Sequence, residues 1–78
     1  MFSPGDLVKV QTDKTSFLGY VLDWDSYSPK NPTPANLELT EKLKEAGFVP
    51  VHIAVGEAYA TALARPELVT LVRHKVGT

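Results

Sequence analysis

The residues best suited to acid–base or metal chemistry are few and widely spaced in this sequence. Asp23 and Asp25 flank Trp24, and two carboxylates two residues apart on a strand would share one face. Calcium and magnesium need more oxygen ligands than this pair supplies. The two histidines, His52 and His74, lack a neighbouring carboxylate pattern that would complete a metal site or orient a general base. We therefore expect no catalytic residue, no metal site and no cofactor.

Nucleophilic and phosphate-binding motifs are also missing. The chain has no cysteine, and its serines lie in turn-like segments rather than in a Gly-x-Ser-x-Gly elbow. The 5 glycines are too scattered to form a phosphate loop or a dinucleotide fingerprint. Residues 29–32 have P-x-x-P spacing, which suits a short polyproline helix or a stiff loop. The sequence predicts a protein that is not an enzyme.

A stripe of large apolar side chains is the feature that most suggests binding. If Gly19 and Val21 face the core of a strand, alternation sends their large neighbours to the opposite face. Those neighbours are Leu18, Tyr20, Leu22 and Trp24. Exposed apolar patches usually mark contacts, and Tyr and Trp are frequent interface anchors. The candidate binding residues are Tyr20, Leu22, Trp24 and Tyr27.

Period-two alternation and turn signals place these residues on short strands. Strands are expected over residues 7–11, 17–24, 48–55 and 69–72. Residues 58–64 carry mixed signals, because alanine favours a helix whereas the preceding Gly56-Glu57 turn favours a hairpin. We assign a strand there. Residues 65–68 predict a tight turn or a single turn of 3₁₀ helix.

One helix is expected over residues 34–46. Thr33 can cap its first turn, Pro34 suits the first helical position, and Gly47 fits a left-handed cap at its end. The apolar positions at helical spacing are Ala35, Leu39, Leu43 and Ala46. This helical stripe either covers the aromatic stripe or leaves it exposed as a contact surface, and the sequence leaves both possibilities open.

Length and composition bound the remaining possibilities. The 78 residues suffice for a single domain over residues 1–78, and a hydrophobic content of 44% is ordinary for a globular protein. The formal charge of -1 argues against a protein that grips nucleic acid by bulk charge. No run approaches the ~20 apolar residues of a membrane helix, and we expect no secretory signal and no membrane partner. The cysteine-free chain fits a cytoplasmic location.

Three segments carry a resemblance to a known fold. The opening 4–10 (PGDLVKV), the strand 19–21 (GYV) and the closing 65–69 (RPELV) resemble the first strand, second strand and last turn of SH3-like barrels, including KOW-type domains. The resemblance implies a mainly β fold, a small five-stranded SH3-like barrel with a short helix inserted between strands 2 and 3. The departure is the long segment 26–47, and an α+β arrangement is the alternative.

The resemblance implies binding rather than a reaction, since SH3-like barrels hold peptides, nucleic acids and other subunits. We expect a non-enzymatic interaction or assembly module that binds a protein partner or associates with itself. A KOW-like nucleic-acid binder is the alternative, in which Tyr20, Trp24 and Tyr27 would stack on bases. The basic residues that would meet phosphates are Lys9, Lys14, Arg73 and Lys75. The acidic residues that would oppose phosphate are Asp6, Asp13, Asp23 and Asp25.

Overall fold

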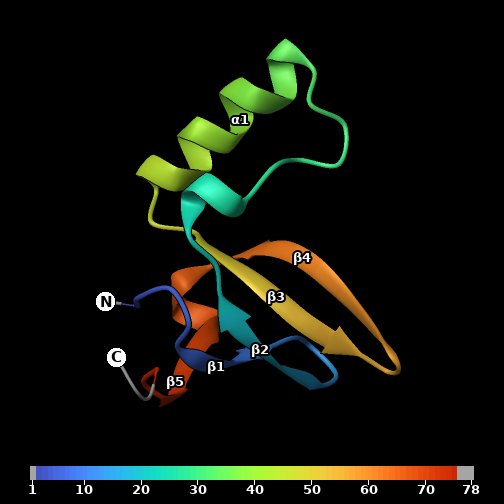
Figure 1. Ribbon diagram of the computed structural model, residues 1–78, viewed down its shortest axis with the longest axis vertical. Helices are drawn as coiled ribbons and strands as arrows, with labels where there is room; N and C mark the ends of the chain where they lie inside the picture. Colours follow the sequence, from blue (N-terminus) through green and yellow to red (C-terminus); the bar gives the residue numbers. More distant parts are fainter. Residues whose placement is uncertain (1, 76–78) are drawn as a thin grey trace.

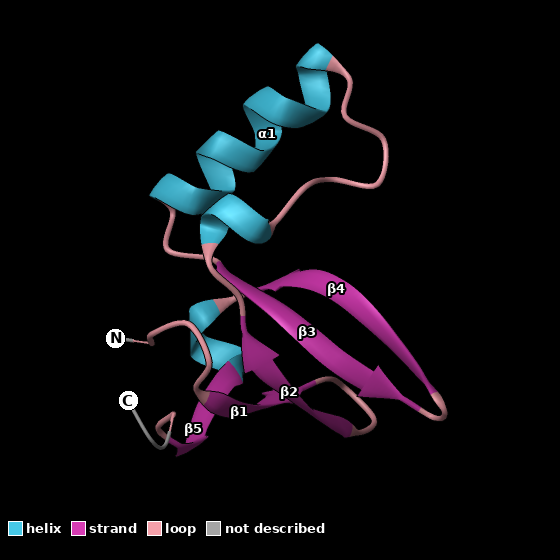
Figure 2. Ribbon diagram, viewed as in Figure 1, coloured by secondary structure: helices cyan, strands magenta, loops and turns pink. Residues whose placement is uncertain are grey.

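The computed structural model describes residues 2–75, which form one antiparallel sheet of five strands and one α-helix (Figures 1 and 2). The strands are β1 (Leu7–Gln11), β2 (Ser16–Val21), β3 (Val49–Val55), β4 (Ala58–Ala64) and β5 (Val69–Arg73). The helix α1 (Pro34–Glu45) connects β2 to β3, and 3₁₀ turns cover Trp24–Ser26 and Pro66–Leu68. The predicted mainly β class, with a helix between the second and third strands, is confirmed.

The strand order in the sheet is β4-β3-β2-β1-β5, and every neighbouring pair is antiparallel. The first four strands pair in sequence order, and β5 returns to pair with β1. Among the described strands this pairing leaves β4 and β5 as two edges, so the sheet is open. Closure into a barrel stays a prediction.

The hydrophobic core lies on one side of the sheet, which we call the inner face. It consists of Val8, Val10, Val21, Val49, Val51, Ala64 and Val69. Phe2, Ile53 and Ala62 pack against this cluster. Valine suits these positions because β-branched side chains pack well on a pleated surface. Period-two alternation then places the intervening side chains on the opposite side, the outer face.

Gly19 allows β2 and β3 to approach closely. It is buried and pairs with Val8 on one side and Ile53 on the other. A Cβ atom at this position would lie 2.6 Å from the backbone oxygen of His52 and 2.9 Å from the Cα of Ile53. The close backbone approach predicted from a glycine within this strand is confirmed.

The predicted helix and hairpin signals are also confirmed. The Thr33 hydroxyl accepts a hydrogen bond from the backbone N–H of Asn36 at 3.2 Å, and Pro34 is the first helical residue. Gly47, just after the helix, has a φ of 90°. Gly56 has a φ of 64° in the turn that joins β3 to β4. Residues 58–64 form the strand β4, as predicted.

The predicted strand over residues 17–24 is wrong at its end. β2 stops at Val21, and Trp24 begins a 3₁₀ turn. The Asp23 carboxylate accepts a hydrogen bond from the backbone N–H of Asp25 at 3.1 Å. Such local side-chain bonds compete with a strand ladder and favour a turn. Asp23 and Asp25 therefore do not share a strand face, and the strand alternation that would align Leu22 and Trp24 with Tyr20 is lost.

Candidate functional site

The helix leaves the outer face uncovered. Figure 1 shows α1 beyond the end of the sheet, on the side where β2 ends and β3 begins. No residue of α1 is buried, and Leu37 and Leu39 are exposed. On the outer face, Leu18 and Tyr20 of β2 keep 53% and 49% of their surface exposed. The helical stripe therefore does not cover Leu18 and Tyr20 of the aromatic stripe.

A row of large side chains crosses the outer face. Tyr20 pairs with His52 of β3 on one side and with Leu7 of β1 on the other, and Leu7 in turn pairs with Arg73. The rings of His52 and Tyr59 stack with their centroids 4.9 Å apart and their planes 6° from parallel. Tyr59, at 65% exposure, ends the row on β4. We call these five residues the outer row.

The charges on the sheet are all positive. None of the 9 acidic residues lies in a strand, and the charged strand residues are Lys9 and Arg73. Lys9 pairs with Leu18 and Thr70, and Arg73 pairs with Leu7, so both cations belong to the outer face. The outer face therefore combines aromatic rings with cations, although the whole chain is slightly acidic.

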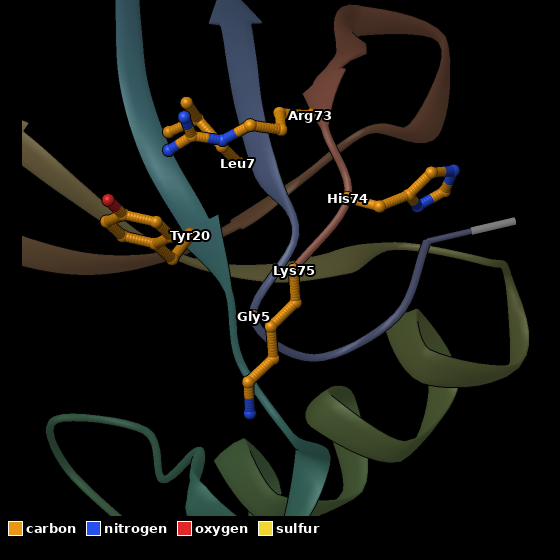
Figure 3. Close-up of a pocket in the computed structure, with 6 residues that line it drawn as sticks. All are labelled: Gly5, Leu7, Tyr20, Arg73, His74 and Lys75. Atoms are coloured by element: carbon orange, nitrogen blue, oxygen red, sulfur yellow. The ribbon is translucent and has the colours of Figure 1, made fainter. Parts of the chain in front are cut away.

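A shallow hollow of about 400 Å³ lies at the β5 end of the outer row. Its lining residues are Gly5, Leu7, Tyr20, Arg73, His74 and Lys75. Figure 3 shows the Arg73 side chain reaching over Leu7 toward the strand that carries Tyr20, whereas His74 points the other way. The Lys75 stem lies against Gly5, where a Cβ atom would come within 2.6 Å of the Lys75 Cδ. The hollow thus brings a ring and two cations together.

Asp6 is the buried acidic group of the described chain, with 2% of its surface exposed. Its carboxylate accepts the backbone N–H groups of Ser3 at 2.9 Å and Lys75 at 3.2 Å, and it lies 3.5 Å from the His74 Nδ1. The hydrogen bond from Ser3 is the largest cause that lowers the pKa of Asp6, and burial opposes it. The Asp6 oxygens are therefore used within the chain, and its opposition to phosphate stays a prediction.

Asp6→Asn is expected to lower the thermal unfolding midpoint at neutral pH and to make it less sensitive to acid. The folded-state pKa of Asp6 lies below its ordinary value, so the ionised carboxylate contributes stability above that ordinary value. This contribution is lost as the pH falls through the folded-state pKa. Circular dichroism melts at neutral and acidic pH would measure it, with Asp13→Asn in an exposed loop as the control. An Asp6→Asn melt that matches wild type at neutral pH would contradict this role.

The remaining candidate residues lie elsewhere. Leu22 and Trp24 line a groove of about 690 Å³ that also includes Phe48 and Lys44. The Trp24 ring meets Tyr27 edge-on, with centroids 5.8 Å apart, and the Lys44 ammonium lies 5.7 Å from the Trp24 ring. The structure therefore divides the four predicted binding residues: Tyr20 lies on the outer face, and the others lie near the junction with α1.

The stack of His52 on Tyr59 is the part of the site that the sequence analysis missed. A two-residue turn at residues 56–57 pairs Ala54 with Tyr59 and so brings Tyr59 diagonally next to His52 on one face. The turn at residues 56–57 was predicted from the sequence. The strand register that this turn sets already places Tyr59 next to His52.

Neither metal ligands nor membrane segments add to the site. Among residues 2–75, no three His, Cys, Asp or Glu side chains gather closely enough to hold a metal ion. Over the same residues, no helix has the length and apolar character needed to cross a membrane. Comparison with family models, curated proteins and solved structures finds no match to this chain.

Proposed function

We propose that the chain is a small non-enzymatic interaction or assembly module whose contact surface is the outer face of the sheet. The observation that carries this proposal is the outer row, whose tyrosines Tyr20 and Tyr59 are exposed on a face that α1 leaves open. Side chains such as Tyr20 and Tyr59 contribute little to the core, and apolar patches of this kind usually mark contacts. The partner is a protein surface or a second copy of the chain.

We also propose that the five strands follow the SH3-like plan. Three features support it: β5 returns to pair with β1, a 3₁₀ turn at Pro66–Leu68 precedes β5, and the turn at Gly5 leads into β1. In this proposal α1 is an insertion between β2 and β3, and its Lys44 ammonium lies 5.7 Å from the centroid of the Trp24 ring at the end of the sheet.

Nucleic acid is the second candidate partner, and one specific observation favours it. The strands carry Lys9 and Arg73 but no acidic residue, while Tyr20 and the stacked His52–Tyr59 pair offer flat rings between these cations and the β4 edge. Cations with stacking rings are the usual elements of a single-strand binding surface. Such binding would weaken steeply as salt rises.

Tyr20→Ser is expected to weaken partner binding about thirtyfold, which corresponds to about 2 kcal/mol for a central aromatic anchor. Light scattering would measure the solution mass at low and high salt, with and without a mixed-sequence single-stranded oligonucleotide. A salt-insensitive dimer that ignores the oligonucleotide and is weakened by Tyr20→Ser supports protein contact through the outer face. A mass gain with the oligonucleotide only at low salt supports nucleic acid.

Trp24→Ala is the matched control for this experiment. Its ring is half-buried in the α1 junction rather than on the outer face, so its loss should leave association unchanged. If Trp24→Ala abolishes association and Tyr20→Ser does not, the contact surface is the groove, and the proposal for the outer face is wrong.

A further inference from the structure

The strand β4 is an edge that lacks the usual protection against pairing with another strand. It runs for seven residues, AYATALA, without a charged residue or a proline. Its register with β3 continues from Ala58 to Ala64 without a bulge. The other edge, β5, carries Arg73, and its pairing with β1 shifts register between Leu7 and Val8. Charges and bulges are the common means of blocking edge pairing, so β4 is the open edge.

The outward backbone groups of β4 come from alternate residues. The two-residue turn makes Val55 and Ala58 a hydrogen-bonded pair. In an antiparallel ladder such pairs alternate with pairs that are not hydrogen-bonded. Tyr59 and every second residue after it therefore point their N–H and C=O groups away from β3. These residues are Tyr59, Thr61 and Leu63. Pro50 pairs with Leu63, and this agrees with the alternation because proline has no N–H to donate to β4.

The β4 sequence is complementary to itself about Thr61. If a second copy runs antiparallel with Thr61 opposite Thr61, then Tyr59 lies opposite Leu63, and alanines lie opposite alanines. The three residues whose backbone groups point away from β3 in one copy then lie opposite the same three residues of the other copy. The same register places Glu57, before the strand, opposite Arg65, after it, which pairs opposite charges at both ends. Both of these residues are exposed.

We propose that two copies of this chain pair through their β4 edges, antiparallel and centred on Thr61. This inference rests on the proposed role as an assembly module and adds a second contact, in which the β4 edge rather than the centre of the outer face binds a second copy of the chain. The two sheets become one continuous sheet about a twofold axis, and directly opposed residues share a face. Both outer faces therefore lie on the same side, and the outer row of each copy, through Tyr59, meets Leu63 of the other.

Opposite charges introduced at Thr61 test this register directly. Thr61 is exposed, so Thr61→Lys and Thr61→Glu should each fold. Each variant alone places like charges opposite each other in the dimer, whereas an equimolar mixture places Lys opposite Glu. We expect light scattering to give twice the 8.5 kDa chain mass for wild type, 8.5 kDa for each variant at the same concentration, and the doubled mass for the mixture at low salt.

Two further variants complete the test. Thr70→Glu makes the same change on the opposite edge and should leave the dimer intact. Thr61→Pro removes an outward N–H without touching the β3 ladder, and it should give the monomer even if a charged variant fails to fold. A monomeric wild type, a dimer that survives Thr61→Lys, or a mixture that stays monomeric would each overturn the edge pairing. A monomer whose outer-face amide signals move with added oligonucleotide would overturn the pairing and leave the proposed function standing.

Discussion

Replacing Gly19 with alanine is expected to lower the free energy of unfolding by about 3 kcal/mol, the upper end of the usual cost of overpacking. The added methyl group would lie 2.6 Å from the His52 backbone oxygen, 2.7 Å from the Ile53 Cγ2 and 2.9 Å from the Ile53 Cα. Because two of these atoms are backbone, relief requires β2 and β3 to move apart. Urea unfolding followed by circular dichroism would measure the loss.

Gly56→Ala is the matched control for this substitution. Gly56 has a φ of 64°, which costs other residues about 1 kcal/mol, but among the described residues no atom beyond its two chain neighbours lies within 4 Å of a Cβ placed there. The two variants therefore separate a steric clash from backbone strain. If Gly19→Ala is no less stable than Gly56→Ala, the close approach of β2 to β3 is wrong. A domain of this size has only ~4–12 kcal/mol of stability, so the expected loss is a large share.

Val51→Ala is expected to cost about 2 kcal/mol, since the buried methyl groups it removes leave a cavity in a small core. Val51 has no exposed surface and occupies the middle of the inner face. Val55, in the same strand, is 42% exposed, so Val55→Ala should cost less than ~0.5 kcal/mol. The same unfolding experiment compares the two.

Val51 and Val55 lie on the same face of β3 by alternation, so their contrast locates the core along the strand, toward the end where β3 begins. If Val51→Ala and Val55→Ala destabilise equally, the burial pattern along β3 is different from the one described. His52, which alternates with Val51 along β3, is half-buried and lies on the opposite, outer face.

The parts of the fold that sequence analysis predicted depend on neighbouring residues. Thr33, Pro34 and Gly47 mark the helix ends through local capping, and Gly56 marks the hairpin through its backbone conformation. These signals act over a few residues, so they can be recognised without tertiary structure. The mainly β class followed from the same local signals.

The features that were not predicted correctly from the sequence depend on long-range contacts or on competing local contacts. At Asp23, a local bond to the backbone of Asp25 overrides the strand propensity of the aromatic residues before it. The Asp6 carboxylate meets Lys75, 69 residues away, which no local pattern reveals. Whether α1 covers the outer face depends on how its connecting loops direct it. The apolar stripe that includes Leu39 shows which side of α1 is apolar, but it does not show where the helix lies relative to the sheet.

The candidate site also shows why whole-chain charge misleads for a protein of this kind. The net charge of -1 averages the acidic helix and turns with a sheet whose charged residues are Lys9 and Arg73. Charge acts over about 8–10 Å at physiological salt, so a partner on the outer face experiences the local cations first. Sequence alternation could predict which strand residues share a face, but the pairing of β5 with β1 brings these two together.

The central claim is that the outer face of the sheet is the contact surface of an interaction module. Backbone amide NMR spectra test it most directly, recorded at low and high protein concentration and then with a mixed-sequence single-stranded oligonucleotide. We predict that, in at least one of the two series, the amide signals that move belong to the outer-face positions around Tyr20, His52 and Thr61. Movement confined to the groove around Trp24 and Phe48, or no movement in either series, would contradict the claim.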